Sequence, residues 1–165
     1  MGFVVIRSTM DFMEVVKKRR SIRKYKTDPI PEETLNQVLE AARLAPSGGN
    51  GQPWHFIVVK DSKRKRMLDI SEWALQAPVV IVGCTEASGQ TDIAIAFEHL
   101  VLAAANFGLG TCWIGRWDAD DEIKKALGIP ANMRVLAATP LGFPAESPSP
   151  RSRKPLSQIV HYEKF

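Results

Sequence analysis

Residues 45–56, APSGGNGQPWHF, stand where a helical pattern gives way to a strand pattern. Glycine and proline both disfavour a helix interior, so their density here predicts a loop. The loop ends in Trp54 and runs into the apolar residues 56–59, FIVV, which is typical of a strand that enters a core. Because ordering such a loop costs conformational entropy, we expect it to hold a ligand.

The remaining elements follow from apolar spacing and turn residues, working outward from this loop. Helices are expected from about Met10 with Ser8 and Thr9 as N-cap, over 31–42, over 62–70, over 92–107 between Thr91 and Gly108, and over 118–127. Strands are expected over 55–60, 78–84, 111–114 and 134–139. The periodicity by itself favours a parallel α/β sheet.

Two segments suggest contacts beyond the core of a single chain. Residues 92–107, DIAIAFEHLVLAAANF, are apolar almost all round, so this helix is expected in a core or against a partner subunit. After Gly142 the chain becomes rich in proline, and 143–165 is expected to form an extended arm. Apolar residues near its end, Ile159, Val160, Tyr162 and Phe165, would give this arm something to bury.

The 165 residues, 45% of them hydrophobic, suit a single domain over 1–165. No apolar run is long enough to span a bilayer and no secretory leader is visible, so we expect a soluble, cytoplasmic protein. Cys84 and Cys112 lie far apart in apolar surroundings. We therefore expect buried, reduced thiols and neither a disulfide nor a metal site.

The net charge of +4 indicates anionic partners, and most Lys and Arg residues fall in three clusters, at 17–26, 60–66 and 151–154. Two interpretations remain open at this point, a nucleic-acid surface and a pocket for a small phosphorylated ligand. The cluster at 60–66 lacks the interleaved aromatic residues that single-strand binding favours.

Motifs for hydrolytic and metal chemistry are missing. The sequence has no GxSxG, HExxH, GxxxxGK[ST] or paired CxxC, and its three histidines lack metal-ligand spacing. The glycines of 108–110, GLG, follow a helix pattern, whereas the dinucleotide fingerprint follows a strand.

What remains are groups suited to phosphate. Arg19, Arg20, Ser21 and Arg23 supply guanidinium forks and a hydroxyl, and Arg151 and Arg153 could close on the same phosphate from the far end of the chain. Ser47, Asn50 and Gln52 add hydrogen-bonding side chains on the glycine-rich loop.

Four segments, RRSIRKYK, PIPEETLNQVLEAARLAPSGGNGQPWHFIVV, GLGTCWIG and PRSRKPLSQIVHYEKF, occur in this order along nearly the whole chain. In sequence and spacing they resemble the FMN-dependent nitroreductase family. The resemblance implies an α+β sandwich with a mostly antiparallel sheet flanked by helices. It also implies a homodimer with two FMN molecules at the subunit interface and NADH or NADPH as electron donor. The 92–107 helix matches the central dimer helix.

The resemblance also implies roles for individual residues. Arg19, Arg20, Ser21 and Arg23 would contact the FMN phosphate, ribityl chain or flavin edge, with Arg151 and Arg153 completing the phosphate site. Pro46, Ser47, Gly48, Asn50 and Gln52 would reach the flavin bound mainly by the other subunit. Cys112, Trp113, Ile114 and Gly115 would lie along the flavin ring, with the N–H of Ile114 or Gly115 near N5.

Flavin chemistry accounts for the lack of a visible catalytic dyad, because the cofactor itself accepts and donates hydride. We expect ping-pong transfer to nitroaromatics, quinones or similar conjugated acceptors. Alternatives are reductive dehalogenation or flavin fragmentation on the same fold, a flavin-storing or electron-carrier protein, and a basic nucleic-acid-binding module. The segment 60–92 is short, which leaves the acceptor unassigned, with Trp73 and Trp117 as candidates for lining its pocket.

Overall fold

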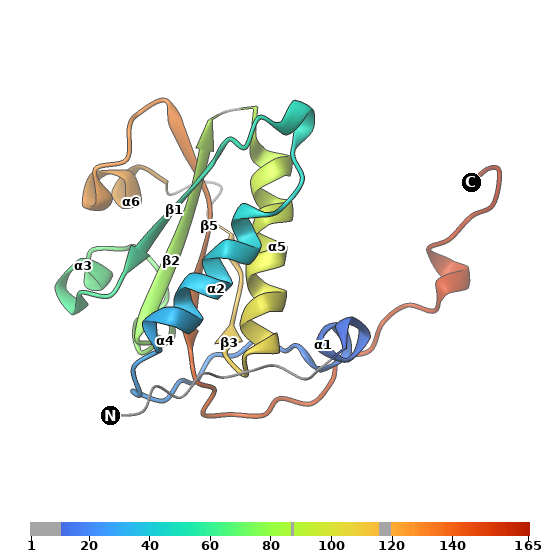
Figure 1. The fold of residues 1–165 in the computed structure, drawn as a ribbon, viewed down its shortest axis with the longest axis horizontal. Coiled ribbons are helices and arrows are strands. Elements are labelled where there is room, and N and C mark those ends of the chain that lie inside the picture. Colours follow the sequence, from blue (N-terminus) through green and yellow to red (C-terminus); the bar gives the residue numbers. More distant parts are fainter. Residues whose placement is uncertain (1–10, 87, 116–119) are drawn as a thin grey trace.

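The computed structural model describes residues 11–86, 88–115 and 120–165. Within these residues one sheet has the strand order β1-β2-β5-β3, with β4 also paired to β5 (Figure 1). The strands are β1 (Trp54–Val59), β2 (Val79–Glu86), β3 (Gly110–Thr111), β4 (Ile114–Gly115) and β5 (Met133–Gly142). Their pairings are antiparallel. The expected antiparallel α+β sandwich is therefore confirmed.

The parallel sheet that periodicity favoured is wrong, for a topological reason. β1 and β2 are antiparallel neighbours, so the helices between them lie in a long hairpin connection and not in a crossover. β2 and β3 both run antiparallel to β5, so they run in the same direction as each other. β5 lies between them, however, so they do not pair.

The helices form layers on both faces of the sheet (Figure 1). They are α1 (Phe12–Lys18), α2 (Glu32–Arg43), α3 (Ser62–Arg66), α4 (Glu72–Leu75), α5 (Gln90–Asn106) and α6 (Asp120–Leu127), with 3-10 turns η1 (Gly48–Asn50) and η2 (Leu156–Gln158). α2 and α5 pack on one face through a core that includes Leu35, Val38 and Phe97. The opposite face is covered by α6 and the segment after α3, through Ile123 and Leu68.

Three helix boundaries differ from the expectation. α1 begins after Asp11, whose carboxylate accepts hydrogen bonds from the N–H groups of Met13 and Glu14, and the expected caps Ser8 and Thr9 lie outside the described residues. α5 begins after Gly89, so Thr91 lies inside the helix and is not its cap. The helix expected over 62–70 is shorter than expected, because α3 ends at Arg66 and the separate helix α4 begins only at Glu72.

Part of the basic cluster at 60–66 is structural. The Lys65 ammonium is buried and donates hydrogen bonds to the carbonyl oxygens of Ala77 at 2.6 Å and Leu75 at 3.3 Å. Burial lowers the pKa of this lysine. Lys60 forms an ion pair with Glu32 at 2.6 Å. Two cations of this cluster therefore have partners within the chain, and the buried one, Lys65, helps to hold the fold.

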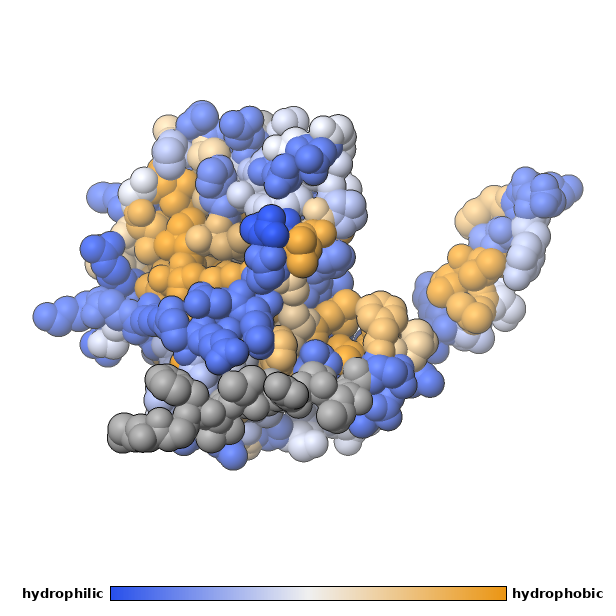
Figure 2. All heavy atoms as spheres, in the orientation of Figure 1, coloured by the Kyte–Doolittle hydropathy of each residue, from blue (hydrophilic) through white to orange (hydrophobic). Residues whose placement is uncertain are grey.

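After β5 the chain runs along the body of the molecule toward α1, and the later part of residues 143–165 then projects away from it (Figure 1). The start of this arm is fixed by the bridge between Tyr25 and Pro144. Apolar side chains farther along it are exposed, including Leu156 at 73% and Tyr162 at 83% (Figure 2). Within one chain, the apolar residues of the arm bury little of their surface.

Both cysteines are buried and free, as expected. In the part of the chain that the structure describes, no helix combines the length and apolarity that crossing a bilayer would require.

Candidate functional site

The first part of the site is the extended segment that follows α1. Arg19 ends the helix, and its N–H donates to the carbonyl of Val15. The next residues lie beside β3, where the N–H of Ile22 donates to the carbonyl of Thr111 at 2.8 Å. This pairing holds the backbone of 19–23 against the sheet.

The C-terminal arm crosses the same segment. Ala145 donates from its N–H to the carbonyl of Lys24 at 2.9 Å. The Glu146 carboxylate accepts from the N–H groups of Arg23 and Lys24. These bonds direct the following residues of the arm along the basic segment.

The two ends of the chain thereby share a cavity of about 440 Å³. Its lining includes all six residues that were expected at a phosphate site, namely Arg19, Arg20, Ser21, Arg23, Arg151 and Arg153. A cavity with five guanidinium groups strongly favours an anion, and a phosphate can accept several of these donors at once.

Arg20 differs from its neighbours in having a partly structural role. One terminal nitrogen donates to the carbonyls of Lys17 at 2.7 Å and Arg19 at 2.8 Å, which caps the end of α1. Its Nε is buried and has no hydrogen-bond partner within the described residues. A buried donor without a partner is costly, and a ligand oxygen in the cavity would satisfy it.

Tyr25 holds the backbone of the basic segment through its hydroxyl. Its buried hydroxyl donates to the carbonyl of Ile22. Burial raises the pKa of Tyr25 far above its usual value, with smaller contributions from Cys112 and Glu146. The side chain therefore remains a neutral hydrogen-bond donor.

The second part of the site is an interruption between β3 and β4. Thr111 lies opposite Leu141 and Ile114 lies opposite Ala138, so in the same register Cys112 faces Pro140. Proline has no N–H, so it cannot donate to a ladder at that point. The Cys112 N–H instead donates to the Thr139 hydroxyl at 3.1 Å. The single strand expected over 111–114 is thus broken in its middle.

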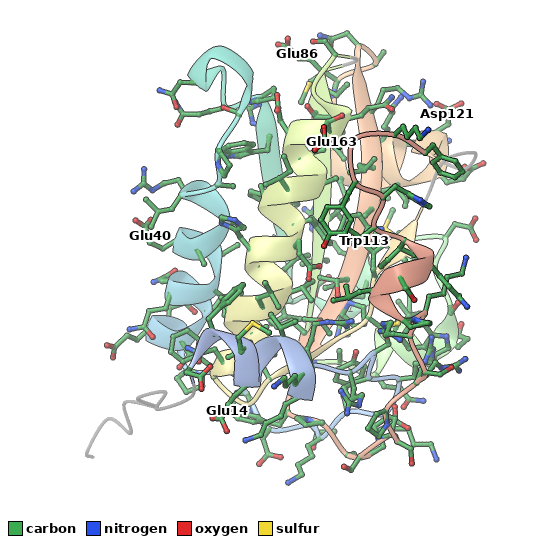
Figure 3. The ribbon with its side chains drawn as sticks, turned by 90° about the vertical axis from the view of Figure 1, so that its right-hand side faces the viewer. Glu14, Glu40, Glu86, Trp113, Asp121 and Glu163 are labelled. Atoms are coloured by element: carbon green, nitrogen blue, oxygen red, sulfur yellow. The ribbon has the colours of Figure 1, made fainter. Side chains whose placement is uncertain are left out.

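This interruption adjoins the basic cavity, because Ser21 forms an isolated bridge with Thr111, the residue before Cys112. Trp113 packs edge-on against Phe97 of α5, with ring centroids 4.8 Å apart, and keeps 37% of its surface exposed. Figure 3 shows it between α5 and β5. The expected contacts of the phosphate and of the ring therefore lie next to each other.

The third part is the loop over 45–53. Asn50 and Gln52 both have positive φ angles, 57° and 49°. Such angles are strained for residues other than glycine and are often found at functional sites. The Gln52 N–H donates to the Ser47 hydroxyl at 3.0 Å, and the Gly48 N–H donates to the Asp92 carboxylate at 3.1 Å. The loop is thus held against the start of α5.

One chain does not bring this loop to the basic cavity. The loop is anchored at the N-terminal end of α5, whereas the smaller cavity that adjoins the basic one is lined by residues at and beyond the other end of this helix, such as Ala105 and Gly108. A helix of 17 residues is about 25 Å long. Figure 1 shows this separation. Pro46, Ser47, Gly48, Asn50 and Gln52 therefore form a group separate from the arginines within one chain.

An apolar groove of about 810 Å³ runs along α5 between α1 and α2. Its lining includes Phe12, Leu44, Ile95 and Leu102. Phe12 and Leu44 are exposed at 67% and 63%. α5 contributes Ile95, Leu102 and Ala103 to this groove, together with the polar residues Glu98, His99 and Asn106. Apolar residues of α5 therefore also lie outside the face that packs on the sheet.

The sequence did not indicate three residues that organise the site. Glu146 was the one carboxylate in the proline-rich stretch 140–155, and that isolation was the available signal. Asp92 was interpreted only as the start of a helix, and the role of Thr139 depends on which strand is its neighbour. Trp117, a candidate for the acceptor pocket, lies outside the described residues.

Comparison with known proteins decides the family. The sequence model described as the nitroreductase family matches residues 16–86 and 70–143, which together include most of the chain. The chain belongs to the nitroreductase family. The matched ranges contain Arg19–Arg23, the loop over 45–53 and the β3–β4 interruption, whereas Arg151 and Arg153 lie outside them.

Similarity to individual proteins supports the same family assignment. A protein of Methanothermobacter thermautotrophicus with the provisional name NADH dehydrogenase/NAD(P)H nitroreductase is 35% identical over 96% of this chain and 90% of its own length. The FMN reductase [NAD(P)H] of Bacillus subtilis is 30% identical over 92% of this chain and 74% of its length. A crystal structure of oxidised iodotyrosine deiodinase bound to FMN and 3-iodo-L-tyrosine superposes with a TM-score of 0.82 at 26% identity, covering 94% of this chain and all of that one.

Proposed function

We propose that this nitroreductase is an FMN-dependent oxidoreductase that takes hydride from NADH or NADPH and passes it to nitroaromatics, quinones or similar conjugated acceptors. The observation that carries the proposal is the basic cavity, formed by both ends of the chain beside the β3–β4 interruption. The names of the relatives support the same cofactor and donors.

The residues present fit FMN. Arg19, Arg20, Arg151 and Arg153 would hold the phosphate, and the partnerless Nε of Arg20 is a donor that this phosphate would satisfy. Ser21 would contact the ribityl chain, since it lies between the cavity and β3. We expect Arg23 to lie beside the flavin edge.

At the flavin ring, we expect a backbone group to make the contact nearest the reacting atom. Cys112 and Trp113 would flank the flavin, and the N–H of Ile114 or Gly115 would donate a hydrogen bond near N5. FMN, when bound, supplies the atom that accepts and later releases hydride. The positive charge of Arg23 would stabilise the negative charge of the reduced ring. One open face for donor and acceptor predicts ping-pong kinetics, which would appear as parallel lines in double-reciprocal plots.

We further propose that the enzyme is a homodimer and that each flavin is completed by the partner subunit. The groove along α5 is a largely apolar, exposed surface, and a second copy of the same groove is its proposed occupant. The loop over 45–53 is exposed and lies far from the cavity of its own chain. Two-fold association would bring it to the cavity of the partner. We expect the enzyme in the cytoplasm.

The phosphate site is tested by Arg19→Ala. Loss of one charged hydrogen bond is worth about 1.5–3 kcal/mol, so the Kd for FMN should rise at least about tenfold. Lys63→Ala removes the same charge from the exposed surface of α3 and is the matched control. Flavin fluorescence titration measures both, and equal affinities in the two variants would contradict the phosphate site.

A further inference from the structure

Trp73, on the four-residue helix α4, contacts a residue of the basic cavity. The guanidinium carbon of Arg23 lies 5.7 Å from the centroid of the Trp73 ring. This distance is within the range of a cation–π interaction, for which tryptophan is the best aromatic partner.

Trp73 is well placed to act as a fixed support. It is half-buried and packs against the small cluster of Ile22, Tyr25 and Ala77. The end of α4 is held in turn by Lys65, whose ammonium donates to the carbonyls of Leu75 and Ala77. The indole is therefore held by packing contacts and by a fixed helix end, and it also contacts Arg23.

Arg23 needs such a support, because it is exposed and its side chain has many rotamers. Its backbone N–H is taken by the Glu146 carboxylate, so the main chain is fixed by the C-terminal arm. No ion pair to Arg23 is found within the described part of the chain, which leaves Trp73 as the contact that orders the guanidinium.

We infer that Trp73 is a positioning residue, which holds the Arg23 guanidinium at the mouth of the basic cavity and so raises the affinity of the site for FMN. The inference rests on the proposed function and deepens it. It assigns to α4 a role in cofactor binding although Trp73 does not line the cavity itself.

The test is a double-mutant cycle with Trp73→Leu, Arg23→Ala and the combined variant, read as Kd for FMN by flavin fluorescence. In the native background Trp73→Leu should raise the Kd about two- to fivefold. In the Arg23→Ala background it should change the Kd by less than about 1.5-fold, since the group it positions is gone. Trp73→Tyr keeps an aromatic face and should remain close to the native protein.

A role confined to packing would give the same loss in both backgrounds and would overturn the inference, as would an unchanged Kd in Trp73→Leu. Thermal melts confirm that each variant is folded, and Trp73→Tyr keeps the test valid if the leucine variant is not. Failure of the proposed function has a different signature, because the native protein itself would then show no FMN binding.

A second readout needs no flavin. In the flavin-free protein the Trp73 ring current should shift the side-chain proton resonances of Arg23 upfield, and Trp73→Leu should return them to ordinary values. Resonances of Arg23 that are already ordinary in the native protein would overturn the contact on which the inference depends.

Discussion

Two residues of the loop over 45–53 have a backbone conformation that does not favour the stability of the chain. Asn50 and Gln52 both adopt the left-handed region that costs most residues about 1–2 kcal/mol. Neither side chain is buried, so packing within the chain does not repay this cost. A role of the two amides at the partner's flavin would explain why glycine does not occupy these positions.

Gln52→Gly should therefore stabilise the protein and weaken FMN binding. Relief of strain outweighs the added flexibility of the unfolded chain, so we expect a gain of about 0.5–1 kcal/mol in the free energy of unfolding. Gln52→Ala keeps the strain and loses the amide, so it should weaken FMN binding without the gain in stability. Urea unfolding and flavin titration of the two variants separate the effects, and unchanged FMN affinity in both would argue against a role for Gln52.

Tyr25→Phe gives a prediction with a pH signature. Loss of the hydrogen bond to the Ile22 carbonyl should cost about 1 kcal/mol at pH 7. The folded-state pKa of Tyr25 is raised by burial, so its contribution to stability is present below the unfolded pKa of about 10 and is lost as the pH rises further. The stability gap between the two proteins should narrow above about pH 10. A gap that stays constant from pH 7 to 10.5 would contradict the buried phenol.

Single residues also show what a sequence can and cannot predict. The basic segments at both ends of the chain were identifiable from composition, and the structure places them around one cavity. The N-caps of α1 and α5 were not identifiable in this way. Asp11, Thr91 and Gly89 are all acceptable near a helix start, and their backbone angles decide which residue is the cap. Glu146 was missed because its partners are about 120 residues away in the sequence.

At the scale of elements, most helices and strands were predictable, but their pairing was not. The sequence pattern of a strand shows that it is buried and leaves its neighbour undetermined. β2 and β3 run in the same direction on either side of α5 in the sequence, but β5 lies between them, so each pairs antiparallel with β5 and not with the other. The break at Cys112 has the same origin, since it depends on Pro140 of another strand lying opposite.

The contact between β2 and α5 is close enough to be tested with one methyl group. A Cβ at Gly83 would lie 2.7 Å from the Phe97 ring and 3.1 Å from Ile93. Gly83→Ala should lower the free energy of unfolding by about 1–3 kcal/mol through overpacking.

Because Phe97 also packs against Trp113, the Gly83→Ala variant should shift the tryptophan emission as well. Gly108→Ala is the comparison, since it has a positive φ of 72° but meets nothing within 4 Å. It should lose stability without changing the emission. Equal spectra for the native protein and Gly83→Ala would show that the two aromatic residues are not coupled.

The whole molecule presents an apolar groove along α5 and an arm whose apolar residues are exposed. Both features are unfavourable for an isolated chain and are expected of a dimer subunit. The proposed cofactor site is likewise incomplete within one chain, because the arginines and the strained loop lie at opposite ends of α5.

Removal of residues 155–165 tests the arm while retaining Arg151 and Arg153. Loss of the exposed apolar residues should weaken dimerisation by at least tenfold, as measured by sedimentation velocity over a range of concentrations. The sheet core should remain folded by circular dichroism. An unchanged dimer would show that the arm does not contribute to association, and a monomeric full-length protein at micromolar concentration would contradict the dimer itself.

The central claim is that this nitroreductase binds FMN and reduces it with a nicotinamide donor. The most direct measurement is the visible absorbance spectrum of the protein reconstituted with FMN, before and after anaerobic addition of NADH or NADPH. The account predicts the bands of bound oxidised flavin, which bleach on addition of at least one donor. A protein that takes up no FMN, or one whose bound flavin neither donor reduces, would contradict it.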